Sequence, residues 1–243
     1  MKPDKRHNLI LSQWLIGLLL FISNITSTVA DELKLQPFAA NYSLHLGQKY
    51  VGQSTLSLKQ SGGLWSWQTS AKTIGIYSWL SNKKPHSETH FSLNNDSYLI
   101  QNLLISDESD ERLYETVHFN WQKKQAIILR KNLTHSASIS DDVYDYNSIK
   151  WLVANMMKTK KSEIEVDFYV KGTIVKSKIK RIDNETLDVP GKKVSAWVYE
   201  QTTVNSKTKW RYYLNPVRPL IPLKIEKLKP GKQTATLLLE SKF

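Results

Sequence analysis

The sequence FAANYSLHL at residues 38–46 sets a pattern that recurs along most of the chain. Its larger apolar side chains occupy every second position, with mostly polar side chains between them. Because successive side chains of an extended chain point to opposite faces, this period of two is typical of a β-strand with one buried face. Residues 47–49 can form a turn, after which residues 52–59 return with Leu56 and Leu58 on the buried face.

The same alternation continues beyond this first hairpin. After a second turn, a shared face is formed by Trp65, Trp67, Thr69 and Ala71. Further segments of this kind lie at residues 113–121, 164–170, 174–183, 194–199, 223–228 and 234–241. About a dozen short strands at regular spacing predict a mainly β fold, either a large curved antiparallel sheet or an incompletely closed β-barrel.

One segment, Ser148 to Lys158, departs from the period of two. The residues that recur there at helical spacing are Ile149, Leu152, Val153 and Met156. Lys150 and Asn155 fall on the opposite side, which predicts that both face solvent. Ser148 or Asn147 can cap the helix through a side-chain oxygen. We therefore expect one α-helix, lying on the concave side of the sheet.

The N-terminal segment has the layout of a secretory signal peptide. Cationic residues precede an apolar run from Leu9 to Ile22, and small residues follow up to Ala30. The run is about 14 residues long, short of the roughly 20 that a membrane-spanning helix needs. We predict a signal peptide at residues 1–30, cleaved after Ala30, and a single β-rich periplasmic domain at residues 31–243. An uncleaved membrane anchor is the alternative.

The amino-acid composition excludes several classes of function. The chain has no cysteine, which excludes disulfides, thiol nucleophiles and cysteine-ligated metal centres. Export also removes the nucleotide pool that kinase or ATPase chemistry requires. A formal net charge of +12 favours an anionic membrane surface or an acidic glycan as partner rather than nucleic acid. Alternatively, the dispersed lysines serve only to keep the protein soluble.

No local motif predicts catalysis or metal binding. His86 and His90 would share a face on a helix, but their surroundings predict a strand that separates the two imidazoles by roughly 13 Å. The carboxylates of residues 107–111 lack the order and the glycine of a calcium-binding loop. No serine nucleophile elbow or phosphate-binding glycine loop is present. We predict no metal, no cofactor and no enzymatic activity.

Several apolar residues are candidates for lining an internal cavity. The segment at residues 76–80 is strongly apolar and follows a strand, so it can close one end of the sheet or contact a ligand. Methionine would add adaptable contacts. The residues that we expect to line such a cavity are Trp65, Trp67, Ile76, Trp79, Leu152 and Met156.

Several motifs, taken in order, also resemble those of a known family. They are Pro37–Tyr42, Val51-Gly52, Ala71–Gly75, Glu88–Phe91, Leu187–Lys192 and Pro222–Glu226. Together they resemble the bacterial exported family known as domain of unknown function 3108, over nearly the whole of the predicted domain. The resemblance implies no catalytic residues. It implies an architecture similar to the curved, incompletely closed sheets of periplasmic lipoprotein carriers, in which a helix covers an apolar concavity.

These observations lead to one functional prediction and two alternatives. We predict a non-catalytic periplasmic protein that binds an apolar or amphiphilic envelope molecule, such as a lipid or acyl chain. One alternative is a structural or interaction protein of the envelope with a filled core. The other is a hydrolase whose paired carboxylates lie far apart in the sequence. The sequence contains no signal for the oligomeric state.

Overall fold

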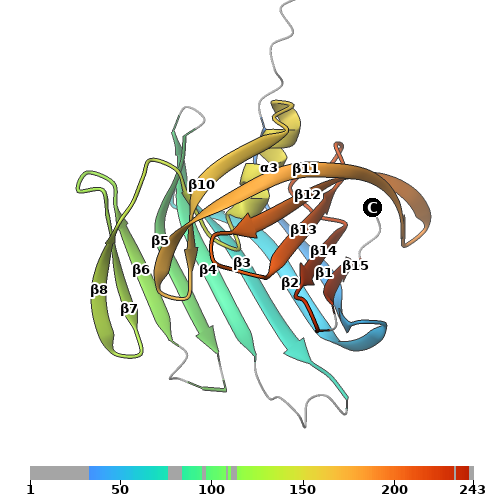
Figure 1. Cartoon of the computed structure of the whole chain (residues 1–243), viewed down its shortest axis with the longest axis horizontal. Coiled ribbons are helices and arrows are strands. Elements are labelled where there is room, and N and C mark those ends of the chain that lie inside the picture. The colour runs from blue at the N-terminus through green and yellow to red at the C-terminus, as the bar shows by residue number, and fades with distance from the viewer. Residues whose placement is uncertain are drawn as a thin grey trace, which may run out of the picture. The chain divides into compact units, whose positions relative to one another are not determined.

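The strands of the first half of the chain pair in the order in which they occur. In the computed structural model, which describes residues 33–75, 84–94, 97–107, 109–110, 114–232 and 234–240, eight strands form this antiparallel meander (Figure 1). They are β1 (Phe38–Leu46), β2 (Lys49–Ser61), β3 (Leu64–Thr73), β4 (Pro85–Asn94), β5 (Ser97–Asp107), β6 (Glu115–Asn120), β7 (Gln125–Arg130) and β8 (Leu133–Ser138).

The second half contributes seven further strands, the first of which pairs in parallel with the next, while the second and later ones form another antiparallel meander that joins the first meander. Its strands are β9 (Val143–Tyr144), β10 (Glu163–Val170), β11 (Thr173–Val189), β12 (Lys192–Thr203), β13 (Lys209–Leu214), β14 (Lys224–Leu228) and β15 (Ala235–Leu239). β15 pairs antiparallel with β1, with Tyr42 opposite Leu239. The described residues therefore form one fifteen-stranded sheet, whose edges are β8 and β9 and which no strand ladder closes.

The alternation in the sequence determines which face of each strand is buried. On β1, Ala40 and Tyr42 are buried, and the Tyr42 hydroxyl donates a hydrogen bond to the Pro222 carbonyl. Toward the end of β1 the register shifts between Leu44 and His45. On β3, Trp67 is fully buried while Ser70 faces solvent. The predicted inward faces of both strands are confirmed along most of their length.

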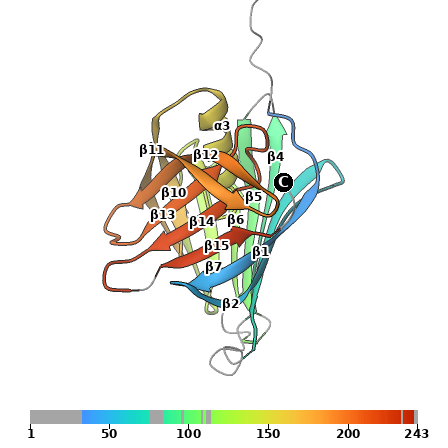
Figure 2. The same cartoon turned by 90° about the vertical axis from the view of Figure 1, so that its right-hand side faces the viewer.

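The helix α3 (Ile149–Lys158) lies between β9 and β10 in the chain and is the one helix among the described residues. It lies at one end of the curved sheet (Figure 2). Trp151 stacks on Tyr98 of β5 with ring centroids 4.9 Å apart, and α3 also contacts β13. Strands from both halves of the sheet thus pack against it. The prediction of a solvent-facing Lys150 is wrong, because only 4% of this residue is exposed.

The cap of α3 differs from the prediction as well. Ser148 has helical backbone angles and makes no side-chain cap hydrogen bond. Instead, the Asp145 carboxylate accepts hydrogen bonds from the backbone N–H groups of Asn147 and Ser148, at 2.6 and 2.8 Å. The Ser148 hydroxyl in turn accepts the backbone N–H of Asp145. This reciprocal pattern is a capping box that begins three residues earlier than expected.

Two further expectations need correction. The described residues contain fifteen strands rather than about a dozen. Part of the difference lies at residues 132–147, which are not among the segments predicted as strands but form β8 and β9. β8 is an exposed edge strand with mostly polar side chains, so it lacks the apolar alternation by which the other strands were recognised.

Some predictions fall on residues that the structure does not describe. The structure does not describe residues 1–32, which include the predicted signal peptide, or residues 76–83, which include the apolar segment at residues 76–80. Residues 33–243 form a unit separate from residues 1–32. Among the helices that the structure describes, none combines the length and hydrophobicity that crossing a bilayer requires.

Candidate functional site

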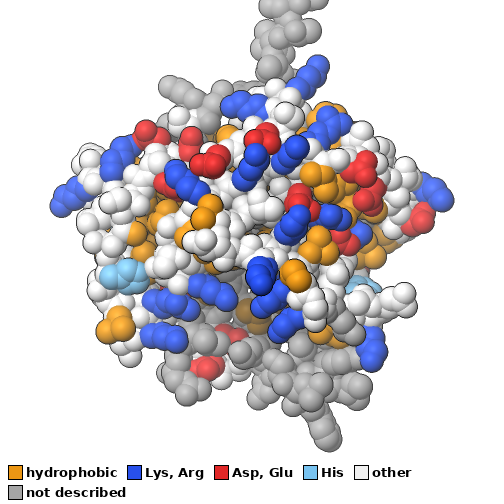
Figure 3. Space-filling view, viewed as in Figure 1, with side chains coloured by type: hydrophobic (Ala, Val, Ile, Leu, Met, Phe, Trp, Pro, Cys, Tyr) orange, Lys and Arg blue, Asp and Glu red, His pale blue; other side chains and the backbone are white. Residues whose placement is uncertain are grey.

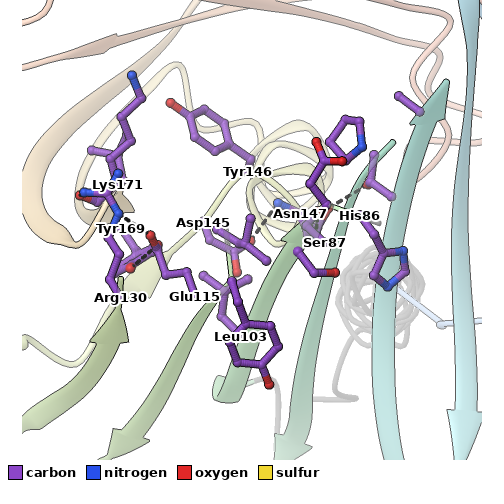
Figure 4. Close-up of a pocket in the computed structure, with 18 of the residues that line it drawn as sticks. His86, Ser87, Leu103, Glu115, Arg130, Asp145, Tyr146, Asn147, Tyr169 and Lys171 are labelled. Carbon is purple, nitrogen blue, oxygen red and sulfur yellow. Dashed lines mark hydrogen bonds and ion pairs between the residues drawn. The ribbon is translucent and has the colours of Figure 1, made fainter. Parts of the chain in front are cut away.

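A cavity of about 410 Å³ lies between the inner faces of β3–β6 and the segment before α3 (Figure 4). We call it the main cavity. Much of its wall is apolar, and the residues that form this part include Ala71, Leu103, Ile105, Tyr114 and Val170. Its volume falls within the range of about 300–1000 Å³ found for small-molecule sites in proteins. The curvature of the sheet therefore leaves space that side chains do not fill.

Charged groups gather at one end of the main cavity. Glu115 of β6 is buried and forms an ion pair with Arg130 of β7, with Nε and Oε2 2.6 Å apart. The hydroxyl of Tyr169 on β10 donates a hydrogen bond to the same carboxylate. Burial and the nearby Glu115 carboxylate raise the pKa of Tyr169 above its ordinary value, so this hydroxyl keeps its proton at neutral pH.

The same groups hold the two ends of the sheet together. Arg130 donates from Nη1 to the Lys171 carbonyl at 2.8 Å, and His135 of β8 hydrogen-bonds the Gly172 carbonyl at 2.8 Å. Lys171 and Gly172 form the tight turn between β10 and β11, with φ angles of 49° and 85°. We call this set the clasp: Glu115, Arg130, His135, Tyr169 and the turn Lys171–Gly172. In a closed barrel, backbone hydrogen bonds between strands join the two ends of the sheet. In this protein, the side chains of the clasp connect them.

A second polar group lies opposite the clasp, where α3 begins. Asn147 is buried, and its side-chain oxygen accepts a hydrogen bond from Thr69 at 2.7 Å. Its amide nitrogen donates to the hydroxyls of Ser87 and Thr89, both at 3.1 Å. Thr89 also donates to Asp145 at 2.7 Å. The start of α3 is thereby fixed to the inner faces of β3 and β4.

A smaller cavity of about 140 Å³ lies behind this polar group, and we call it the inner cavity. It shares four lining residues with the main cavity: Thr69, Ser87, Tyr146 and Asn147. Its wall also includes Lys150 of α3 and aromatic side chains from β1 and β13. The Tyr146 ring packs against Trp210 and Phe168, with centroids 5.1 and 5.0 Å away. The two cavities are thus neighbours that meet at these four residues.

Comparison with known proteins places the sequence in a family. The model of the family described as protein of unknown function (DUF3108) matches residues 41–238. The chain belongs to the DUF3108 family. The predicted resemblance is thereby confirmed, and a search of the curated proteins found no match to this sequence.

Two solved structures are similar to this DUF3108 protein. One is a β-barrel-like protein of the domain of unknown function DUF1849 from Brucella abortus. It has a TM-score of 0.57 at 10% identity, with 85% of this chain and 97% of that chain covered. The other is the hypothetical lipoprotein YmcC from Escherichia coli K12, with a TM-score of 0.33 at 9% identity, covering 100% and 99% of the two chains. The first structure supports a β-barrel-like fold for this chain. The TM-score of the second is too low to support a conclusion about the fold.

The described residues that were expected to line a cavity lie mostly in the packed core of this DUF3108 protein. Trp67 is fully buried between Phe38 and Phe91. Trp65 is half-buried against the same core, and Leu152 and Met156 are buried in α3. None of these four lines the main or the inner cavity. Ile76 and Trp79 lie outside the described residues, so their role as ligand contacts stays a prediction.

The residues that do line the two cavities carry a signal that sequence reasoning missed. Glu115 shares an inward face with Val117 and Phe119, and Arg130 shares one with Ile128. A charged residue at a buried position of an alternating strand needs a partner inside the protein. Their positions on the inward faces of β6 and β7 would have identified Glu115 and Arg130 as candidates. The helical position of Lys150 gave no comparable signal, because it follows the polar face of α3.

The two imidazoles of β4 lie closer together than the roughly 13 Å predicted, because both turn toward the Glu88 carboxylate. Glu88 lies between them, with its carboxylate 2.8 Å from His90 Nε2 and 3.9 Å from His86 Nε2. Burial opposes the effect, but hydrogen bonds from Gln68 and His90 lower the pKa of Glu88 below its ordinary value. Among the described residues, no group of three or more histidine and carboxylate side chains has the geometry to hold a metal ion.

Basic side chains are spread over the surface of this DUF3108 protein. On the face shown in Figure 3, lysine and arginine are scattered, with acidic side chains among them in many places. The prediction that a membrane surface or a glycan is a partner stays untested.

Proposed function

We propose that this protein is a non-catalytic binding protein for an apolar or amphiphilic envelope molecule with a lipid-like chain, and that it acts in the periplasm. The main cavity is the observation that carries the proposal. It combines a volume of about 410 Å³ and a largely apolar surface with polar and charged groups at its two ends, and such a volume and surface are typical of small-molecule sites. The N-terminal sequence supports export, since it has the layout of a signal peptide.

A long-chain molecule fits this site better than a compact polar one. An apolar wall gains free energy by burying hydrocarbon, at about 25 cal/mol for each Å² removed from water. The polar groups at the two ends of the cavity are largely engaged in hydrogen bonds and ion pairs within the protein. They would contact the polar part of a ligand, while the apolar wall would bind its chain.

Binding of a neutral fluorescent fatty alcohol tests the proposal. Ile105 faces the main cavity, so Ile105→Trp should fill part of it and weaken binding about tenfold or more. Ile127→Trp is the matched control, since Ile127 is 42% exposed on β7 and lines neither cavity. Equal binding by both variants, or no binding by the unaltered protein, would contradict the proposal.

Native mass spectrometry of the gently purified protein provides a second test. A co-purifying mass in the range of a lipid supports the binding function. A clean mass, together with failure to bind the fatty alcohol, would favour a structural protein with a filled core.

A further inference from the structure

Lys150 lines the inner cavity although only 4% of the residue is exposed. Its ammonium group donates hydrogen bonds to the carbonyls of Tyr146 and Asn147, at 2.7 and 3.4 Å. The Asp145 carboxylate favours the charged form of Lys150, but among the described residues no carboxylate forms an ion pair with it. An ammonium group has three N–H donors, so these two acceptors leave one donor without a protein partner. A buried charge in this state is costly unless something else binds it.

Most of the other polar side chains of the inner cavity have hydrogen-bond partners within the protein. Tyr42 donates to the Pro222 carbonyl, and Tyr212 donates to the Gln201 side chain, both at 2.9 Å. Ser54 donates to the Ser70 carbonyl at 2.7 Å. Lys150 is the charged residue that lines this cavity, it has one donor to spare, and its charge selects an anion.

The position of the inner cavity determines what kind of anion can reach Lys150. The cavity is small, and it meets the main cavity at Thr69, Ser87 and Asn147. An anionic group attached to a long chain can thus lie near Lys150 while its chain occupies the main cavity. We infer that the ligand is an anionic amphiphile whose carboxylate or phosphate group binds Lys150. This inference rests on the proposed function and specifies its substrate class.

Lys150 is a better anion site than the lysines at the other end. Lys131 and Lys171 also line the main cavity, but both are exposed to water. Water weakens the attraction between opposite charges, whereas a buried site strengthens it. Arg130 is already paired with Glu115. The anionic group should therefore be bound at the inner cavity.

Titration of the delipidated protein with matched ligands tests the inference. Palmitate and lysophosphatidate carry the anion, hexadecanol has a chain without charge, and inorganic phosphate has charge without a chain. At pH 7 we expect at least one of the anionic lipids to bind about tenfold or more tightly than hexadecanol. A preference for palmitate identifies a carboxylate group, and one for lysophosphatidate identifies a phosphate group. Inorganic phosphate should bind far more weakly than either.

Lys150→Met removes the charge while keeping a side chain of similar length. This variant should lose the preference for the anion, so that palmitate and lysophosphatidate bind it only as tightly as hexadecanol does. The matched control Lys59→Met, at an exposed position of β2 that lines neither cavity, should keep the preference for the anion. Circular dichroism establishes that both variants are folded.

A measurement on the unaltered protein covers the case in which Lys150→Met does not fold. Burial lowers the pKa of Lys150 to about 8, so the preference for the anion should fall several-fold between pH 7 and pH 9.5. The other titratable groups near Lys150 are Asp145, Tyr146, Tyr42 and Tyr212. Burial raises the pKa of all three tyrosines, which keeps them neutral over most of this range.

The outcomes separate the inference from the proposed function. Equal affinity for hexadecanol and both anionic lipids, or an undiminished preference in Lys150→Met, would overturn the inference and leave the binding function intact. Inorganic phosphate binding as tightly as the lipids would overturn it too. Failure of every chain-bearing ligand to bind would overturn both.

Discussion

Asp145 connects the helix to the sheet through a single carboxylate. It accepts hydrogen bonds from two backbone N–H groups of α3 and from Thr89 of β4. We expect Asp145→Ala to lower the free energy of unfolding by about 2–3 kcal/mol, because a helix cap and a buried hydrogen bond are lost together. Chemical denaturation measures the change. Asp141→Ala is the control, because its side chain is 85% exposed, and it should stay within about 0.5 kcal/mol.

Lys150 makes a second residue-scale prediction, for the dependence of stability on pH. Its pKa is lowered from 10.5 to about 8 by burial, with Asp145 opposing the shift. Between these values the unfolded chain binds more protons than the folded one, so stability rises with pH. The unliganded protein should gain about 1 kcal/mol between pH 7.5 and pH 9. Lys150→Met should not show this rise, and a similar rise in both proteins would exclude Lys150 as its source.

At the scale of single residues, the sequence predicted the apolar positions better than the polar site. The period of two identified Ala40, Tyr42 and Trp67 as inward-facing, because burial of apolar surface follows strand geometry. Glu115 and Lys150 were not identified as site residues. Glu115 shares the inward face of β6 with apolar residues, a local signal that attention to apolar positions alone misses. Lys150 falls on the predicted polar face of α3, so its burial depends on tertiary contacts that leave no local pattern.

At the scale of elements, the clasp joins β6–β8 to the turn between β10 and β11. We expect Glu115→Gln to weaken it, because Arg130 loses its ion-pair partner and Tyr169 loses a charged acceptor. The free energy of unfolding should fall by about 1–3 kcal/mol. Hydrogen exchange should quicken in β8 and at residues 171–172, while β1 and β2 keep their protection. Uniform quickening across the sheet would mean that the clasp has no local role.

Elements with clear periodicity were predicted well, and edge elements were not. α3 begins within a residue of its predicted start, because its apolar spacing is local information. β8 and β9 were missed, since an edge strand buries little and a two-residue strand is too short to show a period. Strand pairing such as that of β1 with β15 is set by the whole fold and has no signal in either segment.

At the scale of the whole molecule, the β1–β15 pair holds the two meanders together. Leu239 is buried on β15 opposite Tyr42, and its N–H donates to the Leu223 carbonyl at 3.0 Å. We expect Leu239→Ala to cost about 2–5 kcal/mol, because truncation leaves a cavity in the centre of the sheet. Leu133→Ala on edge strand β8 is the control, since Leu133 is 72% exposed and should change stability by less than about 0.5 kcal/mol. Equal costs at both positions would contradict this account of the central pair.

The pairing of β1 with β15 also sets the order of events in biogenesis. Ser43 and Leu238 hydrogen-bond across a separation of 195 residues, so the centre of the sheet forms only after β15 has been synthesised. Contacts this distant in sequence slow folding, because a long loop must close before they stabilise anything. The β1–β15 pair is therefore absent from the nascent chain until the last strand has been translated. That delay would suit the proposed export, in which a translocation channel admits extended polypeptide.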